Sequence, residues 1–457
     1  MPSKSNRNIK ENLVNELKKS PGNRVKVAIT DIDGVLRGKY LHKDKFLIAS
    51  ESGFGFCNVV FGWDSADVCY DNGSYTGWHT GYPDALARID LSTFRHVPWD
   101  NQVPFFLGEF EASPGKPLEI CPRQLLKKVL ARAQSAGFKA SCGMEFEWFN
   151  FKETPQSFAE KKFSSPEPLT PGMFGYSILR SSLNQPFFAA LMEELAAFGI
   201  PLEGLHTETG PGVFEAAILY SDALEAADRA VLFKTSVKEI AYRFGILPSF
   251  MAKWNSQLPG CSGHIHQSLW SGDKNLFYDE TDSLKMSGVF KSYVAGQLHC
   301  LPEILPFFAP NVNSYKRLVD GFWAPTKVTW GVDNRTTALR AIPGSSKSTR
   351  VETRVPGSDV NPYLAIAACV ASGLYGVEKN LELKDKPITG SAYQDSKAAR
   401  LPRNLYEATM RLSESKVARE IFGEAFVDHF VKTRFWEWRQ FQDSVTNWEL
   451  QRYFEIT

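Results

Sequence analysis

Apolar and polar residues alternate between Cys142 and Phe149, in the segment CGMEFEWF, and this pattern predicts a β-strand. Residues two apart on a strand point to the same face. Glu145 and Glu147 should therefore project to one side, about 7 Å apart by the rise of a strand. Like charges at this distance repel each other and resist burial. The segment raises the question of what offsets that repulsion.

A second pattern begins at CPRQLLKKVLARAQSAGF, where apolar residues recur at helical spacing. Pro122 suits a first helical position, and Gly137 suits the position just after a helix. Similar periodicities predict further helices at about 185–198, 221–245, 284–301, 361–378 and 404–422. Strand patterns fall at about 140–150, 213–220, 263–270 and 337–342.

The first part of the chain has a different pattern of residues. VKVAITDIDGVLRGKYL predicts two strands around a turn at Asp33 and Gly34, and residues 50–118 suggest short strands joined by loops rich in Gly, Trp and Tyr. Residues 1–24 are polar and charged, without the apolar core of a signal peptide. We predict an N-terminal extension with a short helix at 1–24, a small β-rich domain at 25–118 and a large α+β domain at 119–457.

Charge and cysteine content narrow the class of protein. The 52 Lys and Arg residues nearly balance 51 Asp and Glu residues, which argues against nucleic acid as a partner. No run of 18 apolar residues occurs, so no membrane span is expected. The seven cysteines are scattered and odd in number, which favours reduced thiols in a cytoplasmic protein over a zinc knuckle.

Further acids and a histidine pair answer the opening question. HTETGPGVFE carries Glu208 and Glu215, GHIHQSL carries His264 and His266 at strand spacing, and RVETR carries Glu352. Carboxylates and a neutral imidazole are ligands that suit two Mg²⁺ or Mn²⁺ ions, and such ions would offset the repulsion within the strand. Taken singly, these motifs could also be a solvated acidic face, a pair of core histidines or an ion-pair network.

A cationic set follows in the same domain. Arginine forks bind carboxylate and phosphate oxygens, although a solvated basic face would have the same composition. Acids that hold metals together with arginines that hold anions are what phosphoryl transfer from a nucleotide needs. No GxxxxGK[ST] motif is present, so a P-loop enzyme is excluded. The cationic set comprises Arg317, Arg335, Arg340, Lys347, Arg350 and Arg354.

The motifs, in this order, resemble the glutamine synthetase superfamily over almost the whole chain. The matching segments are DIDGVLRGKY, GMEFEWF, HTETGPGVFE, SFMAKW, SGHIHQSL, NSYKRL, NRTTALR and VETRVPGSDVNPYLAIAA. The resemblance implies an α+β fold, with an N-terminal β-grasp-like domain and a C-terminal catalytic domain that is an open barrel of antiparallel strands with helices. It also implies a homo-oligomeric ring, usually a dodecamer, with active sites between neighbouring subunits.

The resemblance also implies roles for individual residues. The first metal site would consist of Glu147, Glu208 and Glu215, and the second of Glu145, His264 and Glu352. Glutamate would be bound by Gly260, Arg317 and Arg354. The nucleotide would be bound by His266, Lys347 and Arg350, and the catalytic arginines would be Arg335 and Arg340. In the implied reaction the γ-carboxylate of L-glutamate attacks ATP to form γ-glutamyl phosphate, and an amine then displaces phosphate.

The chain departs from the family pattern at positions that belong to the amine site. Ammonia-using members carry a glutamate where RLVDGFWAP has Trp323, and Val213 replaces their usual glutamine. The aspartate that a neighbouring subunit gives to the amine site has Asp64 as its best candidate, flanked by Trp63. These changes favour an apolar amine substituent. They resemble the glutamate–amine ligase branch, whose members make γ-glutamylamides from organic amines, here an alkyl or aryl monoamine.

Other interpretations remain open at this stage. Trp323 could serve packing alone, with Asp320 replacing the lost acid. A glutamine synthetase is one alternative. A γ-glutamylpolyamine synthetase is another, although no extra acids are placed for distal ammonium groups. A non-catalytic structural relative is disfavoured because all six predicted metal ligands are present.

Overall fold

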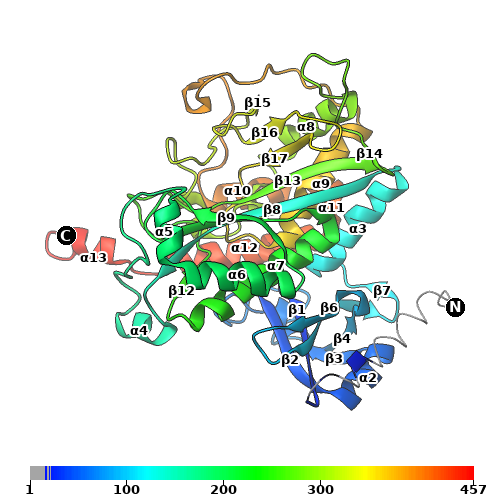
Figure 1. The fold of residues 1–457 in the computed structure, drawn as a ribbon, viewed down its shortest axis with the longest axis vertical. Coiled ribbons are helices and arrows are strands. Elements are labelled where there is room, and N and C mark those ends of the chain that lie inside the picture. Colours follow the sequence, from blue (N-terminus) through cyan, green and yellow to red (C-terminus); the bar gives the residue numbers. More distant parts are fainter. Residues whose placement is uncertain (1–15, 18–19, 21) are drawn as a thin grey trace.

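The computed structural model describes residues 16–17, 20 and 22–457. Most of the helix predicted within residues 1–24 therefore lies outside the described residues. In the remainder of the N-terminal part, a seven-stranded sheet runs in the order β2-β1-β6-β4-β3, with β5 and β7 also paired to β6 (Figure 1). Its elements are β1 (Arg24–Thr30), β2 (Leu36–His42), α2 (Lys43–Ser52), β3 (Phe54–Cys57), β4 (Asp84–Ile89), β5 (Arg95–Val97), β6 (Val103–Ser113) and β7 (Lys116–Pro117).

The predicted first hairpin is confirmed. β1 and β2 pair antiparallel from Arg24 opposite His42 to Thr30 opposite Leu36, and β1 also pairs parallel with β6. Gly34 in the connecting turn has φ 84°, a conformation that glycine adopts without steric cost. The turn docks on the larger part of the chain, because the Asn361 side chain donates to the backbone carbonyls of Asp31 and Ile32.

A ten-stranded sheet forms the second part, in the order β15-β16-β17-β13-β8-β10-β9, with β11 and β12 paired to β8 and β14 paired to β13. Its neighbours are antiparallel except β15 and β16, which are parallel. Together with the first sheet and the helices, it confirms the predicted α+β class and open antiparallel barrel. The strands are β8 (Lys139–Phe151), β9 (Leu202–Thr207), β10 (Val213–Ile218), β11 (Ser221–Asp222), β12 (Leu247–Ser249), β13 (Gly263–Ser271), β14 (Lys274–Asn275), β15 (Trp330–Val332), β16 (Leu339–Ile342) and β17 (Arg350–Thr353).

Helices cover the sheet, and within the described residues no helix is both long and apolar enough to cross a membrane. Long helices α7 and α9 pack against each other, and α7 also packs on β8 (Figure 1). The helices are α3 (Pro122–Ser135), α4 (Pro155–Glu160), α5 (Ile178–Leu183), α6 (Gln185–Ala197), α7 (Ala223–Tyr242), α8 (Gly288–Cys300), α9 (Pro362–Glu378), α10 (Leu405–Glu414), α11 (Lys416–Phe422), α12 (Glu424–Gln442) and α13 (Asn447–Tyr453).

One predicted helix, 404–422, is wrong as a single element. Ser415 has φ −72° and ψ 112°, which are not helical, so the chain forms α10 and α11 instead. The Ser415 hydroxyl accepts a hydrogen bond from the Ala418 amide at 2.9 Å and donates to the Glu303 carboxylate. These side-chain bonds replace helical backbone bonds at the break. The predicted helix at 284–301 likewise begins later, at Gly288, because Ser287 caps it.

Strand β8 has one face in the core, as its alternation predicted. Met144, Phe146 and Trp148 are at most 1% exposed, and the Phe146 ring stacks on Phe233 of α7 at 5.8 Å between centroids. Glu145 and Glu147 point to the other face. The division of the chain at residue 119 stays a prediction.

One buried arginine links the two sheets. Arg123, at the start of α3, is 2% exposed and forms ion pairs with Asp90 and Glu109 of the N-terminal part, at 2.9 and 2.7 Å. On its other side it pairs with Asp228 of α7 at 3.0 Å, and Asp228 also accepts from the Tyr363 hydroxyl of α9. Breaking a buried ion-pair network of this kind leaves charges without partners, which is strongly destabilising.

The hairpin turn generates a test of stability. In Gly34→Ala, the new Cβ would lie 2.9 Å from the Cα of Asn361, and the residue would keep φ 84°. We expect a loss of about 2–4 kcal/mol, the sum of a left-handed backbone and overpacking. In Gly81→Ala, φ is 70° but nothing lies within 4 Å of the new Cβ, so this matched control should lose only about 1 kcal/mol. Equal losses in the free energy of unfolding, measured in urea for the two variants, would contradict close docking of the turn on Asn361.

Candidate active site

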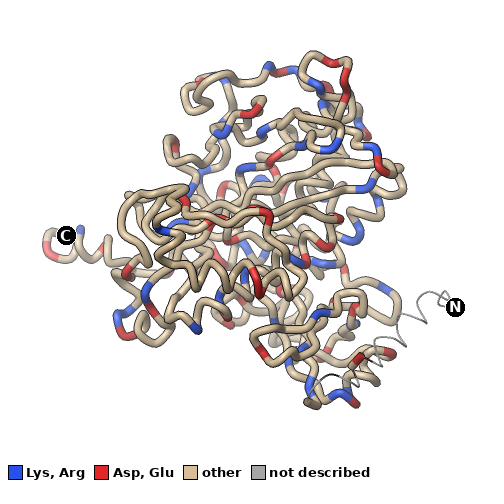
Figure 2. Tube along the Cα trace, in the orientation of Figure 1, with Lys and Arg blue, Asp and Glu red and all other residues tan. Residues whose placement is uncertain are grey.

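A cavity of about 500 Å³ lies on the face of the large sheet to which Glu145 and Glu147 point. Acids and one histidine occupy part of its wall: Glu145, Glu147, Glu208, Glu215 and His264. Arginines occupy another part: Arg317, Arg335, Arg340 and Arg354. Most of the residues singled out from the sequence are therefore brought together. Figure 2 shows Lys and Arg interspersed with Asp and Glu along the part of the chain that the structure describes.

Strand register explains why the acids converge. Glu215 of β10 lies opposite Glu147 of β8, and His206 of β9 lies opposite Glu215. On the other side of β8, His264 of β13 lies opposite Glu145. Directly opposed residues on one face have Cβ atoms about 4.5–5.5 Å apart, so these pairings fix neighbouring side chains side by side.

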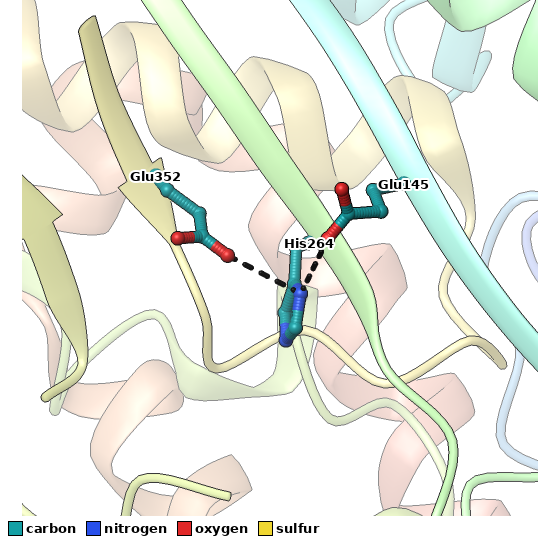
Figure 3. Close-up of side chains that lie close together, drawn as sticks. All are labelled: Glu145, His264 and Glu352. Atoms are coloured by element: carbon teal, nitrogen blue, oxygen red, sulfur yellow. Dashed lines mark hydrogen bonds and ion pairs between the residues drawn. The ribbon is translucent and has the colours of Figure 1, made fainter. Parts of the chain in front are cut away.

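Glu145, His264 and Glu352 form a first cluster, with one residue from each of three strands; it corresponds to the second predicted metal site (Figure 3). The His264 Nδ1 atom lies 3.2 Å from Glu145 Oε1 and 3.3 Å from Glu352 Oε1. Burial raises the pKa of Glu145, but the hydrogen bond and charge of His264 and the charge of His266 outweigh it and bring the pKa to about 2. The remaining ring nitrogen, His264 Nε2, is buried without a hydrogen-bond partner.

Glu352 is held by two arginines. Its carboxylate forms ion pairs with Arg354 and, at 2.9 Å, with Arg340 Nη1. Burial raises the pKa of Glu352, but the charges of Arg354, the two histidines and Arg340 outweigh it and hold the pKa well below its usual value. Arg340 also pairs with Asp333, and Arg354 Nε donates to the carbonyl of Arg335 at 3.0 Å. The two arginines are thus fixed in direction.

The second cluster contains a histidine that sequence reasoning missed. His206 Nε2 lies 3.0 Å from Glu215 Oε1, and Nδ1 lies 3.8 Å from Glu208 Oε2. Burial lowers the pKa of His206, but the hydrogen bond to Glu215 outweighs it and raises the pKa above its usual value. Burial and the charges of Glu145 and Glu147 raise the pKa of Glu215. His206 could have been found from its position two residues before Glu208, at strand spacing.

Tyr176 was also missed. Its ring stacks on the His206 imidazole at 4.3 Å between centroids, and it lines the cavity. Its φ of 55° is unusual for a large residue. Tyr176 lies in the loop before α5, and no local pattern in the sequence links that loop to the acids. Only the tertiary structure reveals the contact.

The glutamate-binding candidates lie at the arginine part of the wall. Arg317 is 3% exposed and donates to the carbonyls of Val355 and Arg354 at 2.8 and 3.1 Å. A Cβ at Gly260 would lie 2.3 Å from the Ala252 carbonyl and 2.9 Å from Arg317 Cγ, so only glycine lets the chain pass here.

A second cavity, of about 360 Å³, adjoins the first and shares Glu145 with it. The three residues predicted to bind the nucleotide, His266, Lys347 and Arg350, line this cavity. Arg350 Nε donates to His266 Nδ1 at 3.1 Å.

Four predicted site residues line neither cavity: Glu352, which is 1% exposed and lies with Glu145 and His264, and Trp63, Asp64 and Val213. Asp64 accepts hydrogen bonds from Trp436 Nε1 at 2.9 Å and from two backbone amides of its own turn. The Arg37 guanidinium lies 5.1 Å from the centroid of the Trp63 ring. The sequence interpretation expected both residues to serve a neighbouring subunit. Val213 is 3% exposed and packs in a small buried cluster with Phe149, Phe151 and Cys261, and its role in the amine site stays a prediction.

Trp323 does line the larger cavity, beside Phe322. It is 58% exposed and has φ 61°. A bulky residue in this backbone conformation is strained, and such strain persists only where the surrounding structure holds it.

Both clusters fit divalent cations. One ligand atom each from Glu145, His264 and Glu352 lie within 4.8 Å of one another, and the same holds for His206, Glu208 and Glu215. Glu208 Oε2 is buried without a hydrogen-bond partner, and a cation would satisfy such an atom. Oxygen and imidazole donors suit Mg²⁺ or Mn²⁺.

Cation binding can be measured by thermal unfolding. We expect Mn²⁺ alone to raise the melting temperature, since an ion at one hundred times its Kd stabilises the folded state by about 2.7 kcal/mol. Glu145→Gln should reduce this rise, because it removes one ligand of the cluster formed with His264 and Glu352. The control Glu119→Gln changes an exposed acid outside both clusters and both cavities and should keep the full rise. An equal rise in both variants would exclude the cluster of Glu145, His264 and Glu352 as a binding site.

Comparisons with known proteins agree with this geometry. The chain is 59% identical over 455 residues to Type-1 glutamine synthetase 2 of Dictyostelium discoideum, covering 98% of this chain and 87% of that protein. It is 39% identical over 436 residues to a glutamate–isopropylamine ligase of Pseudomonas sp, covering 94% and 95%. The solved GmaS/ADP complex superposes with a TM-score of 0.84 at 27% identity, covering 97% of this chain and 99% of that one.

The family model for the glutamine synthetase catalytic domain matches residues 119–453, which is most of the chain. This match and the relatives confirm the resemblance found in the sequence. The chain belongs to the glutamine synthetase family of ligases.

Proposed function

We propose that this protein joins the γ-carboxylate of L-glutamate to an organic monoamine, with ATP as the energy source. The products would be a γ-glutamylamide, ADP and phosphate. The observation that carries the proposal is Trp323 in the wall of the larger cavity, beside Phe322. An indole there gives the amine region an apolar surface in place of a carboxylate.

The first half-reaction forms γ-glutamyl phosphate. Arg317 and Arg354, with the backbone at Gly260, would hold glutamate so that its γ-carboxylate oxygen faces the phosphates. That oxygen attacks the γ-phosphorus of ATP, and ADP leaves. Arg335 and Arg340 would stabilise the charge on the transferring phosphoryl group, because fixed donors in a cavity need no reorganisation during the step.

The nucleotide would lie in the smaller cavity. His266, Lys347 and Arg350 offer its phosphates two cationic side chains and an imidazole. The shared wall at Glu145 puts this cavity next to the glutamate region, as phosphoryl transfer between the two substrates requires.

Two divalent ions are part of the proposal. The first would be held by Glu147, Glu208 and Glu215, and the second by Glu145, His264 and Glu352. When bound, they would supply positive charge that offsets the approach of two anionic substrates.

In the second half-reaction the carboxylates near Tyr176 would attract the protonated amine, and one of them would accept its first proton. The free amine nitrogen then attacks the acyl carbon, phosphate leaves, and the nitrogen passes its second proton to solvent. Tyr176, Phe322 and Trp323 would contact the apolar substituent of the amine and exclude water from the acyl phosphate. The Pseudomonas relative, named for isopropylamine, supports a substrate of this size.

Ammonia is the second candidate. The Dictyostelium relative, 59% identical, is named a glutamine synthetase, and this favours ammonia as the nitrogen donor. Against it stands the aromatic wall, which offers an ammonium ion no carboxylate at Trp323.

We also propose that the protein works in the cytoplasm as a homo-oligomeric ring, a dodecamer. Asp64 and Trp63 lie outside the cavities of their own chain, so their role in the amine site depends on such an assembly.

A panel of amines tests the proposal directly. With saturating glutamate and ATP, phosphate release should have a higher kcat/KM for methylamine, isopropylamine or aniline than for ammonium or putrescine. A higher value for ammonium would establish glutamine synthetase activity instead. A higher value for putrescine would indicate a polyamine substrate.

The role of Trp323 predicts a switch of specificity. In Trp323→Glu the apolar wall becomes an anion near the amine. The carboxylate attracts ammonium. An apolar substituent beside it would strip water from the charge, which is unfavourable. We expect kcat/KM for ammonium, relative to the best monoamine, to rise about tenfold, equivalent to about 1.4 kcal/mol. Trp323→Phe keeps an aromatic wall and should retain the original preference. An unchanged ratio in Trp323→Glu would assign Trp323 to packing alone.

A further inference from the structure

Lys253 lies close to the larger cavity, because its side chain contacts Phe322, a residue of the cavity wall. It is 5% exposed and belongs to the segment between β12 and β13. Its amide donates to the Asn313 side chain at 2.9 Å, and its carbonyl accepts from the same side chain at 2.8 Å. Asn313 belongs to the short helix η4 (Val312–Lys316), which Arg317 directly follows. The backbone of Lys253 is therefore fixed to the element that presents Arg317.

The partner of the Lys253 ammonium is an aromatic ring. Its Nζ lies 4.2 Å from the centroid of the Phe322 ring, which is the shortest cation–ring distance among the described residues. No ion pair or hydrogen bond of this ammonium occurs within the part of the chain that the structure describes. A desolvated cation over a ring face is attracted by the ring quadrupole.

Phe322 belongs to the loop formed by residues 318–325, and its side chain lies at the cavity. Gly321 and Trp323, on either side of Phe322, have φ of 84° and 61°. Trp323 is 58% exposed, and Val319 is 40% exposed. Neither side chain is buried enough to fix the loop by packing. The loop is also held by the ion pair between Asp320 and Arg400 at 2.8 Å and by Ala324, which is 1% exposed. Phe322 is the loop residue that both lines the cavity beside Trp323 and contacts the Lys253 ammonium.

We propose that Lys253 is a positioning residue for amine use, which holds Trp323 against the cavity through the ring of Phe322. The inference rests on the proposed function, since it concerns the wall that the amine would meet. With the contact intact, the wall keeps water from γ-glutamyl phosphate until the amine attacks. Without it, water attacks the acyl carbon, and glutamate and phosphate are released with no amide formed.

The test measures phosphate and amide separately. Lys253→Met keeps an unbranched side chain and removes the charge. Phe322→Leu removes the ring. Each should raise the ratio of phosphate released to amide formed, and the KM for the amine, by about 2- to 30-fold, the range expected for a desolvated cation–ring contact. The KM for ATP should stay unchanged.

A double variant and a matched control make the result specific. Lys253→Met with Phe322→Leu should be no worse than either single change, because both remove the same contact. Lys238→Met is the control: Lys238 lies 5.9 Å from the Phe250 ring, and neither residue lines the cavities. It should leave the phosphate-to-amide ratio and the amine KM unchanged.

The outcomes separate the two proposals. If the wild-type protein releases no phosphate with glutamate, ATP and any amine, the proposed function fails. If the wild type forms amide and both single variants keep its phosphate-to-amide ratio and amine KM, the role of Lys253 is overturned while the function stands. Additive effects in the double variant would also overturn it. If Lys253→Met does not fold, Lys253→Gln against Lys253→Arg decides the same question, because arginine keeps a cation for the Phe322 ring and should retain the wild-type ratio, whereas equal values in the two variants would overturn the role of Lys253.

Discussion

Repulsion among carboxylates on one face of the large sheet is the constraint on which the site depends. Register places Glu147 opposite Glu215, and Glu145 lies two residues from Glu147 on the same strand. Such a face could not stay packed without positive partners. His264 and two arginines offset the charge at one cluster, and His206 offsets it at the other. These partners come from separate strands, so the charge balance exists only in the folded sheet.

The same constraint gives the cavity two chemically different regions. Buried arginines face the acids across it, and Arg317 and Arg354 are held by backbone carbonyls and by Glu352. An anionic substrate finds its counter-charges already oriented there, which lowers the cost of ordering on binding. Beside the acids, Tyr176 and Trp323 give an aromatic surface in strained backbone conformations. Strain of this kind is typical of binding sites.

The fold class and most of the site could be predicted because they rest on local patterns and ordered motifs. Alternation in β8 predicted the faces of Glu145 and Met144 correctly, and Pro122 marked the start of α3. The break between α10 and α11 at Ser415 could not be predicted, because the hydrogen bond from the Ser415 hydroxyl to Glu303 joins residues that are distant in the sequence. Val213 was assigned to the amine pocket by its position in a motif, and its packing against Phe149, Phe151 and Cys261 joins residues that are distant in the sequence. Tyr176 reaches His206 only through the path of its loop.

Arg123 has a consequence for how this architecture can be taken apart. Its guanidinium is shared between acids of the small sheet and an acid of α7. Excising the first hundred or so residues, or grafting the larger part onto a foreign partner, would leave a buried cation with half of its anions. Chimaeras of this chain should therefore exchange Asp90, Glu109, Arg123 and Asp228 together, as one indivisible module. Fusion points chosen at the apparent seam between the sheets would cut through it.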